Sequence, residues 1–294
     1  MREFDVVTGE RGLRLRVCSW GDKHPRPTLI LHGYLEQAAA WDAVATALPG
    51  QILAPDHRGH GLSEHVGNGG FYHFWDYVSD VDGLIQEIAP EGPIDVIGHS
   101  MGGTLACLFA ALRPELIRRL VLIEGLGPPD FGLTPHARAL QFLTHQRKKP
   151  RHRPMASLED GVARMRANNP GIPEAVARAL VVRMTRPVEP EDPMVEPGST
   201  GSLVWTWDPI HKSRSPQQFH EEMFISFLRQ IQAPTWLVDG ADSPYAALPH
   251  DHRAQAIPNV QGRVRVPGAG HLLHHDQPQA LAEVLRSLLF SEHP

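Results

Sequence analysis

The segment with the clearest potential for chemistry is residues 98–103, which read GHSMGG and contain the pattern Gly-x-Ser-x-Gly. It follows a short apolar run at residues 94–97 and opens a stretch rich in small residues, so a strand should lead through a tight turn into a helix. Such a turn strains the backbone of its serine and leaves room only for glycine at the flanking positions. We therefore predict that Ser100 is a nucleophile held above a sheet.

A serine hydroxyl at its ordinary pKa is a poor nucleophile, so Ser100 requires a histidine base from elsewhere in the fold. Among 18 histidines, His271 fits this need because it follows Gly270 just after the apolar run at residues 263–266. A loop at the carboxyl end of that strand would carry it toward Ser100. The nearby His274 and His275 are interpreted as structural, since the three histidines lack a convincing carboxylate or cysteine partner for a metal site.

Acyl transfer also requires N–H donors for the oxyanion. One is expected at Met101, at the start of the helix after the serine. The other is expected after the apolar run at residues 28–31, where the sequence reads HGYLE and Gly33 lets the backbone turn close to the site. We predict that the N–H groups of Tyr34 and Met101 form an oxyanion hole. The residues expected to contact substrate are Tyr34, Leu35, His99 and Trp205.

Four segments, in this order, resemble the signature regions of the α/β-hydrolase superfamily: His32-Gly33, residues 56–63 (DHRGHGLS), residues 98–103 and Gly270-His271. The resemblance implies a serine hydrolase with a mostly parallel central sheet, helices on both faces and a variable cap. It also implies that residues 56–63 form a structural loop, although Asp and His alternate there as in a metal site. Residues 35–36 and 205–209 (WTWDP) are similar to the branch called serine hydrolase-like proteins. Members that use an aspartate nucleophile, such as epoxide hydrolases and haloalkane dehalogenases, are excluded by Ser100.

The acid that would orient His271 departs from the family pattern. Many relatives carry it in a Gly-x-x-Asp turn after the strand that corresponds to residues 235–238, but here Ser243 has that spacing and Asp242 lies one residue early. Other relatives carry it after the preceding strand, where Glu124 follows residues 120–123. Either carboxylate could stabilise the His271 imidazolium. Glu124 is preferred, and Asp242 remains the alternative.

The elements that must position these residues follow from the alternation of short apolar runs with helical patterns, which is typical of an α/β sheet covered on both faces. A hairpin could join residues 3–7 to residues 13–17, because Gly9 and Gly12 bracket a polar turn. The other predicted strands are residues 28–31, 51–54, 94–97, 120–123, 235–238 and 263–266. The predicted helices are residues 71–88, 102–112, 216–230 and 278–289.

The alternation breaks once, after residue 123, where a segment far longer than a normal connection precedes the next buried-strand pattern. Apolar residues recur at helical spacing within it, at residues 136–146, 158–167 and 174–184. We predict a core domain of residues 1–125 and 216–294 and a helical cap of residues 126–215.

Composition narrows the class of protein. The chain has 294 residues and a net charge of −5, so it carries no global positive field for nucleic acid. No apolar run approaches the roughly 18 residues that span a bilayer, and the first residues do not read as a signal peptide, which predicts a cytoplasmic protein without a membrane span. Cys18 and Cys107 are too few for a disulfide framework and are expected to be buried.

Together these features predict a serine hydrolase that cleaves a small carboxylic ester, thioester or lactone and needs neither cofactor nor metal. C–C bond hydrolysis, acyl transfer to an alcohol and perhydrolysis use the same triad and remain alternatives. A non-enzymatic relative that binds a small ligand is a further alternative, because the acid is displaced from its usual position. The sequence leaves open whether the protein is a monomer or a homodimer.

Overall fold

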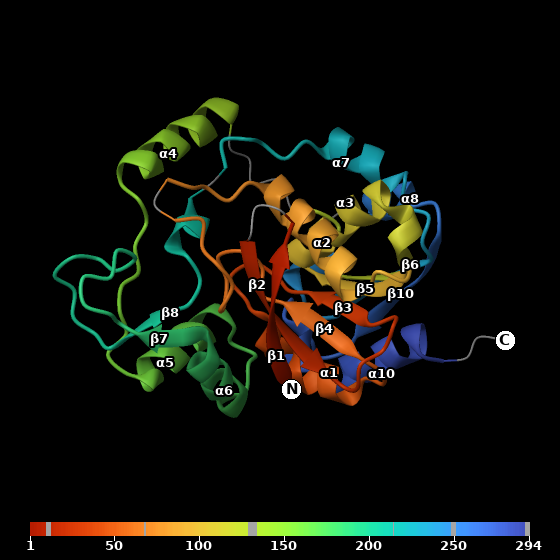
Figure 1. Ribbon diagram of the computed structural model, residues 1–294, viewed down its shortest axis with the longest axis horizontal. Coiled ribbons are helices and arrows are strands. Elements are labelled where there is room, and N and C mark those ends of the chain that lie inside the picture. The colour runs from red at the N-terminus through yellow and green to blue at the C-terminus, as the bar shows by residue number, and fades with distance from the viewer. Residues whose placement is uncertain (10–12, 68, 129–133, 214, 248–250, 292–294) are drawn as a thin grey trace.

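A sheet of eight strands forms the centre of the part of the chain that the structure describes (Figure 1). This structure, a computed structural model, describes residues 1–9, 13–67, 69–128, 134–213, 215–247 and 251–291. The strands of the sheet are β1 (Arg2–Thr8), β2 (Leu13–Trp20), β3 (Thr28–Leu31), β4 (Ile52–Pro55), β5 (Ile94–His99), β6 (Ile117–Ile123), β9 (Thr235–Gly240) and β10 (Val260–Val266).

The strands lie in the order β1-β2-β4-β3-β5-β6-β9-β10. β2 runs antiparallel to both of its neighbours, and the remaining neighbours pair in parallel. The carboxyl ends of β3, β5, β6, β9 and β10 therefore open on one edge, where ligands bind in sheets of this kind. This arrangement confirms the predicted α/β-hydrolase fold. Of the turn predicted between β1 and β2, Gly12 lies outside the described residues.

Buried strands feed two hydrophobic cores, because successive side chains of a strand point to opposite faces. In β3, Leu29 and Leu31 enter one core and Ile30 enters the other. The helices on the first face are α2 (Phe74–Ile88), α3 (Met101–Leu112), α7 (Glu221–Leu228) and α8 (Asp251–Ala256). Those on the second face are α1 (Asp42–Ala47), α9 (Leu273–Asp276) and α10 (Pro278–Leu289).

Short 3-10 turns connect several of these elements: η1 (Ala38–Trp41), η2 (Pro114–Leu116), η3 (Pro209–Lys212) and η4 (Pro244–Ala247). The helix predicted over residues 216–230 is confined to α7. Two acidic residues, Glu221 and Glu222, begin this helix, where negative charge is favoured by the helix dipole.

The segment between β6 and α7 lies at one side of the sheet (Figure 1). Its described elements are α4 (Pro135–Arg147), α5 (Leu158–Asn168), α6 (Glu174–Met184), β7 (Thr185–Pro187) and β8 (Leu203–Trp205). The helices match the three predicted helical patterns, whereas the small antiparallel pair of β7 and β8 was not predicted. Val162 of α5 and Val181 of α6 join the second core, so this segment packs directly on the α1 side of the protein. Its status as a separate cap domain stays a prediction.

Both cysteines are buried, as expected. Burial raises the pKa of the Cys18 thiol to about 12 and also raises that of Cys107, which keeps both thiols neutral. Within the described ranges, no helix combines the length and the apolar character that crossing a membrane requires.

Candidate active site

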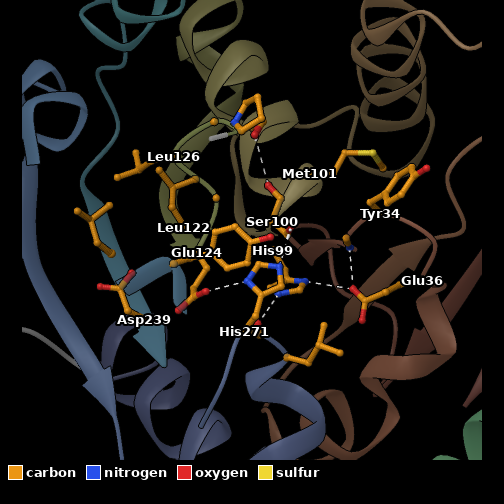
Figure 2. Close-up of a pocket in the computed structure, with 18 of the residues that line it drawn as sticks. Tyr34, Glu36, His99, Ser100, Met101, Leu122, Glu124, Leu126, Asp239 and His271 are labelled. Carbon is orange, nitrogen blue, oxygen red and sulfur yellow. Dashed lines mark hydrogen bonds and ion pairs between the residues drawn. The ribbon is translucent and has the colours of Figure 1, made fainter. Parts of the chain in front are cut away.

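Ser100 lies at the junction of β5 and α3, at the carboxyl edge of the sheet (Figure 2). Its backbone has φ 52° and ψ −114°, a conformation that L-residues rarely adopt. The turn is tight enough that a Cβ on Gly103 would lie 2.5 Å from the Cα of Gly125. Glycine at this position therefore allows α3 to pack against the end of β6, and the packing holds the serine in its strained conformation.

His271 follows β10, and its ring lies between Ser100 and Glu124 (Figure 2). Its Nε2 lies 3.1 Å from Ser100 Oγ, and its Nδ1 lies 2.7 Å from Glu124 Oε2. The three side chains come from the ends of β5, β10 and β6. Parallel pairing thus brings together a serine, a histidine and a carboxylate that are far apart in the sequence.

Glu124 is held by more than its contact with His271. Its side chain is only 1% exposed; Oε1 accepts the N–H of Gly240 at 2.9 Å, and Oε2 accepts the hydroxyl of Ser243 at 2.6 Å. Burial raises the pKa of Glu124, but the hydrogen bonds from His271, Ser243 and Gly240 together lower it by more than burial raises it. The pKa therefore lies below its ordinary value. The carboxylate therefore stays charged beside the imidazole.

The alternative carboxylate, Asp242, is not brought to His271. Its side chain is exposed, while its N–H donates to the carbonyl of Ala269. This backbone bond aligns the turn after β9 with the loop that carries His271, and it places Ser243 rather than Asp242 against Glu124. Ser243 was noted in the sequence only for its spacing; its bond to the carboxylate was not predicted.

The loop after β3 places Tyr34 at the mouth of the site. Tyr34 is 48% exposed, and its hydroxyl donates to the carbonyl of His211 at 2.7 Å. The next residue, Leu35, has φ 59°, and its N–H donates to Nε2 of His60 at 3.2 Å. Across the pocket, Met101 is the first residue of α3, so its N–H has no acceptor within the helix.

A cavity of about 500 Å³ opens beside Ser100. Of the four residues expected to contact substrate, Tyr34 and His99 line this cavity, whereas Leu35 and Trp205 do not. The backbone of Leu35 turns away toward His60, and Trp205 packs against the second core from β8, which is the anchoring role open to a tryptophan. Within the described residues 134–213, no side chain lines the cavity.

A second buried carboxylate, Glu36, was not singled out by the sequence. It contacts His99 and His274, and His275 lies 3.7 Å away (Figure 2). For His274 and His275, the expectation that no carboxylate partner is near was therefore wrong, because Glu36 reaches them from a loop far away in the sequence. Ligand-type atoms of Glu36, His274 and His275 lie within 4.8 Å of one another. In this structure the carboxylate already accepts N–H donors, so a metal ion would have to displace them.

The loop of residues 56–61 is held by hydrogen bonds to neighbouring parts of the chain. Asp56 accepts the N–H groups of Ala38 at 2.7 Å and Leu62 at 2.8 Å. Arg58 forms a bidentate pair with Asp80. Each carboxylate therefore has protein partners, which agrees with the interpretation of this segment as structural.

Comparisons with known proteins place the chain among hydrolases. Residues 27–167 match the family described as the alpha/beta hydrolase fold. A serine hydrolase-like protein of Danio rerio is 27% identical over 300 residues, which cover 95% of this chain and 86% of that protein. An esterase of Mycobacterium tuberculosis is 28% identical, covering 92% of this chain and 84% of that one. A solved structure, the thioesterase domain from the curacin biosynthetic pathway, matches with a TM-score of 0.82 and 29% identity over 97% of this chain and 99% of that chain.

The family match, the full-length relatives and the order of the strands point to the same conclusion. The similarity extends beyond the motif around Ser100, because the relatives and the solved structure cover nearly the whole chain. The chain has the α/β-hydrolase fold, its residues 27–167 match that family, and serine hydrolase-like proteins are among its relatives.

Proposed function

We propose that this protein is a serine hydrolase that cleaves a carboxylic ester, thioester or lactone through an acyl-enzyme on Ser100. The observation that carries the proposal is the continuous series of hydrogen bonds from Ser100 Oγ to His271, at 3.1 Å, and from His271 to Glu124, at 2.7 Å. A nucleophile bonded to a base, with the base oriented by a third group, is the arrangement that activates a serine.

In the first half-reaction, Nε2 of His271 takes the proton of Ser100 as Oγ attacks the carbonyl carbon. The imidazolium that forms keeps its Nδ1–H bonded to Glu124, whose lowered pKa keeps it negative. The same Nε2 then returns the proton to the departing alcohol or thiol. Water next attacks the acyl-enzyme with His271 as base, which releases the acid and restores Ser100.

The oxyanion would be held by the N–H groups of Met101 and Tyr34. The Met101 N–H lies at the N-terminus of α3, where the helix dipole favours negative charge. Tyr34 lies in the facing loop, whose backbone is tied down at the neighbouring Gly33 and Leu35. Fixed donors of this kind stabilise the transition state because they need no reorganisation during the reaction.

The cavity favours a substrate with an apolar portion. Its volume of about 500 Å³ suits a small molecule, and its wall includes Met101, Leu122, Leu126 and Leu237. The named relatives include an esterase and a thioesterase domain, which supports ester and thioester bonds as the first to test.

The test is hydrolysis of p-nitrophenyl esters and acyl thioesters of increasing chain length by the wild type and by Ser100→Ala. We expect turnover by the wild type and a loss of about 10³-fold or more in kcat in the variant, since removing a nucleophile disables the whole triad. A fluorophosphonate probe should label the wild type on Ser100 and leave Ser100→Ala unlabelled. Circular dichroism of the variant controls for folding.

Competing acceptors separate hydrolysis from the alternatives that share the triad. Added alcohol or hydrogen peroxide should leave the free acid as the main product; an ester or peracid product would favour acyl transfer or perhydrolysis. Absence of both turnover and labelling in the folded wild type would overturn the proposal.

A further inference from the structure

The carboxylate of Glu36 lies beneath the proposed catalytic residues and is 8% exposed. Its Oε2 accepts the N–H of Gly33 at 2.9 Å and lies 3.1 Å from Nδ1 of His99. Its Oε1 lies 2.8 Å from Nε2 of His274. Figure 2 shows Glu36 joined to His99, on the side of the site opposite Glu124. Neither side chain has a role in the proposed proton transfers.

The partners of Glu36 belong to the three segments that carry the reacting groups. Gly33 directly precedes Tyr34, a proposed oxyanion donor, and His99 directly precedes Ser100. His274 lies one helical turn after His271, at the start of α9. One buried carboxylate therefore contacts the oxyanion loop, the nucleophile strand and the base loop at once.

His99 completes the connection on its other side. Its Nε2 lies 2.9 Å from the backbone carbonyl of His271, which can only accept a hydrogen bond. Its Nδ1 faces Glu36 Oε2, which already accepts the Gly33 N–H. Both ring nitrogens thus face acceptors, and both contacts are satisfied only if both nitrogens carry protons. The geometry describes an imidazolium paired with a carboxylate.

We propose that Glu36 and His99 are positioning residues: a buried carboxylate–imidazolium pair that holds the oxyanion loop and the His271 loop in register with Ser100. This inference rests on the proposed function, because it assigns the pair its purpose through Ser100, His271 and the Tyr34 N–H.

The surrounding charges favour this ionisation. Burial raises the pKa of Glu36, but His274 and His99 together lower it by more than burial raises it. The pKa therefore lies well below its ordinary value. Burial lowers the pKa of His99, but Glu36, the His271 carbonyl and Glu124 together raise it by more than burial lowers it. The pKa of His99 therefore lies above its ordinary value. The His271 ring also packs against His99, with the ring centres 4.9 Å apart. Among the other histidines around the pair, burial lowers the pKa of His32, His274 and His275. These three rings are therefore neutral near pH 7, and His99 is the cation that balances Glu36.

The test measures Glu36→Gln, His99→Gln and the double variant. Glutamine keeps the shape of Glu36 but removes its charge and presents an N–H₂ group to a histidine donor. We expect each single variant to lower kcat by about 10- to 100-fold, the usual effect of losing a partner behind a reacting side chain. KM should change by no more than about twofold, because the oxyanion donors are needed most in the transition state.

The double variant measures the coupling between the two residues. It removes both charges, so no charge is left unpaired, and it should lose less activity than the product of the two single effects. If Glu36→Gln alone does not fold, the kcat of the double variant is still measured and tests the proposal. A folded double variant with wild-type kcat would overturn the proposal, as would independent effects of the two substitutions.

His275→Leu is the matched control. His275 lies 3.7 Å from the same carboxylate and is 5% exposed, but neither of its ring nitrogens has a hydrogen-bond partner among the described residues. Its substitution should leave kcat unchanged. An effect as large as that of Glu36→Gln would show that any disturbance of this buried region lowers activity, and would contradict a specific positioning role.

The rate of Ser100 labelling by a fluorophosphonate separates failure of this inference from failure of the proposed function. Labelling needs the serine, its base and the oxyanion donors but no knowledge of the substrate. If no ester is turned over but labelling slows about 10-fold or more in Glu36→Gln and not in His275→Leu, the pair positions the site and only the substrate assignment fails. Equal labelling rates in the folded variants and the wild type would refute the positioning role.

Discussion

The hydroxyl of Ser243 donates a 2.6 Å hydrogen bond to Glu124, on the same carboxylate oxygen that faces His271. Ser243 follows β9, and Glu124 follows the neighbouring strand β6. The turn where many relatives would carry their acid therefore supplies a donor to an acid placed one strand away. This relationship leads to two predictions about the proposed triad.

The first prediction compares the two candidate carboxylates. Glu124→Gln should lower kcat by about 10³-fold or more, because the amide no longer stabilises the imidazolium or selects its tautomer. Asp242→Asn should keep kcat within about twofold of the wild type, since the Asp242 side chain is exposed. Steady-state kinetics of both folded variants decide which carboxylate orients His271. A large loss in Asp242→Asn alone would reverse the assignment.

The second prediction concerns the pH profile of Ser243→Ala. Removing a hydrogen bond from the charged form of Glu124 raises the pKa of this carboxyl toward its ordinary value. Because the group then binds a proton at higher pH, activity should begin to fall at a higher pH on acidification than it does in the wild type. The measurement is kcat/KM between pH 4 and 8, and an unchanged acid limb would show that Ser243 has no influence on the carboxylate.

The third prediction tests the packing that holds Ser100. Gly103→Ala places a Cβ 2.5 Å from the Cα of Gly125, so α3 or the end of β6 must shift. Overpacking of this kind costs about 1–3 kcal/mol of unfolding free energy. Urea denaturation measures it. Gly69→Ala is the control, because a Cβ there meets no atom within 4 Å, and an equally stable Gly103→Ala would contradict the close contact.

The fourth prediction concerns stability in acid. Burial lowers the pKa of His32, His152 and His211 to about 4 each, whereas an unfolded histidine titrates near 6.5. Below pH 6.5 the unfolded chain binds protons that the folded chain does not, so stability falls as the pH falls toward 4. At pH 5 the loss is about 2 kcal/mol for each such histidine.

Urea unfolding at pH 7 and pH 5 measures this loss. The His152→Gln variant has no titrating ring at that position, so its difference between the two pH values should be about 2 kcal/mol smaller than that of the wild type. The same difference in both proteins would show that His152 does not remain neutral in the folded state.

Local patterns in the sequence were sufficient for much of the fold. The turn at Ser100 is indicated by its glycines and by the apolar run before it. His271 is indicated by its position after the last predicted strand. The alternation of apolar runs and helical patterns predicted an α/β sheet, and the resemblance of four segments to a known family implied the α/β-hydrolase fold, which the sheet order and the family match confirm. These features are readable because each depends on residues close together in the chain.

Contacts between distant segments were decided only by the tertiary structure. The sequence preferred Glu124 but left Asp242 as an alternative. The pairing of β6 with β9 brings Ser243 and His271 to Glu124 and leaves Asp242 exposed. Trp205 looked like a pocket residue but packs into a core.

The network around Glu36 shows the physical reason. Its partners Gly33, His99 and His274 come from the loop after β3, the end of β5 and α9, three segments far apart in the sequence. Periodicity and motif spacing indicate which face of its own helix or strand a residue lies on. They do not show which segments meet at the edge of a sheet. The sequence by itself therefore determined the fold and the proposed nucleophile and base, Ser100 and His271, and the tertiary structure determined which residues surround them.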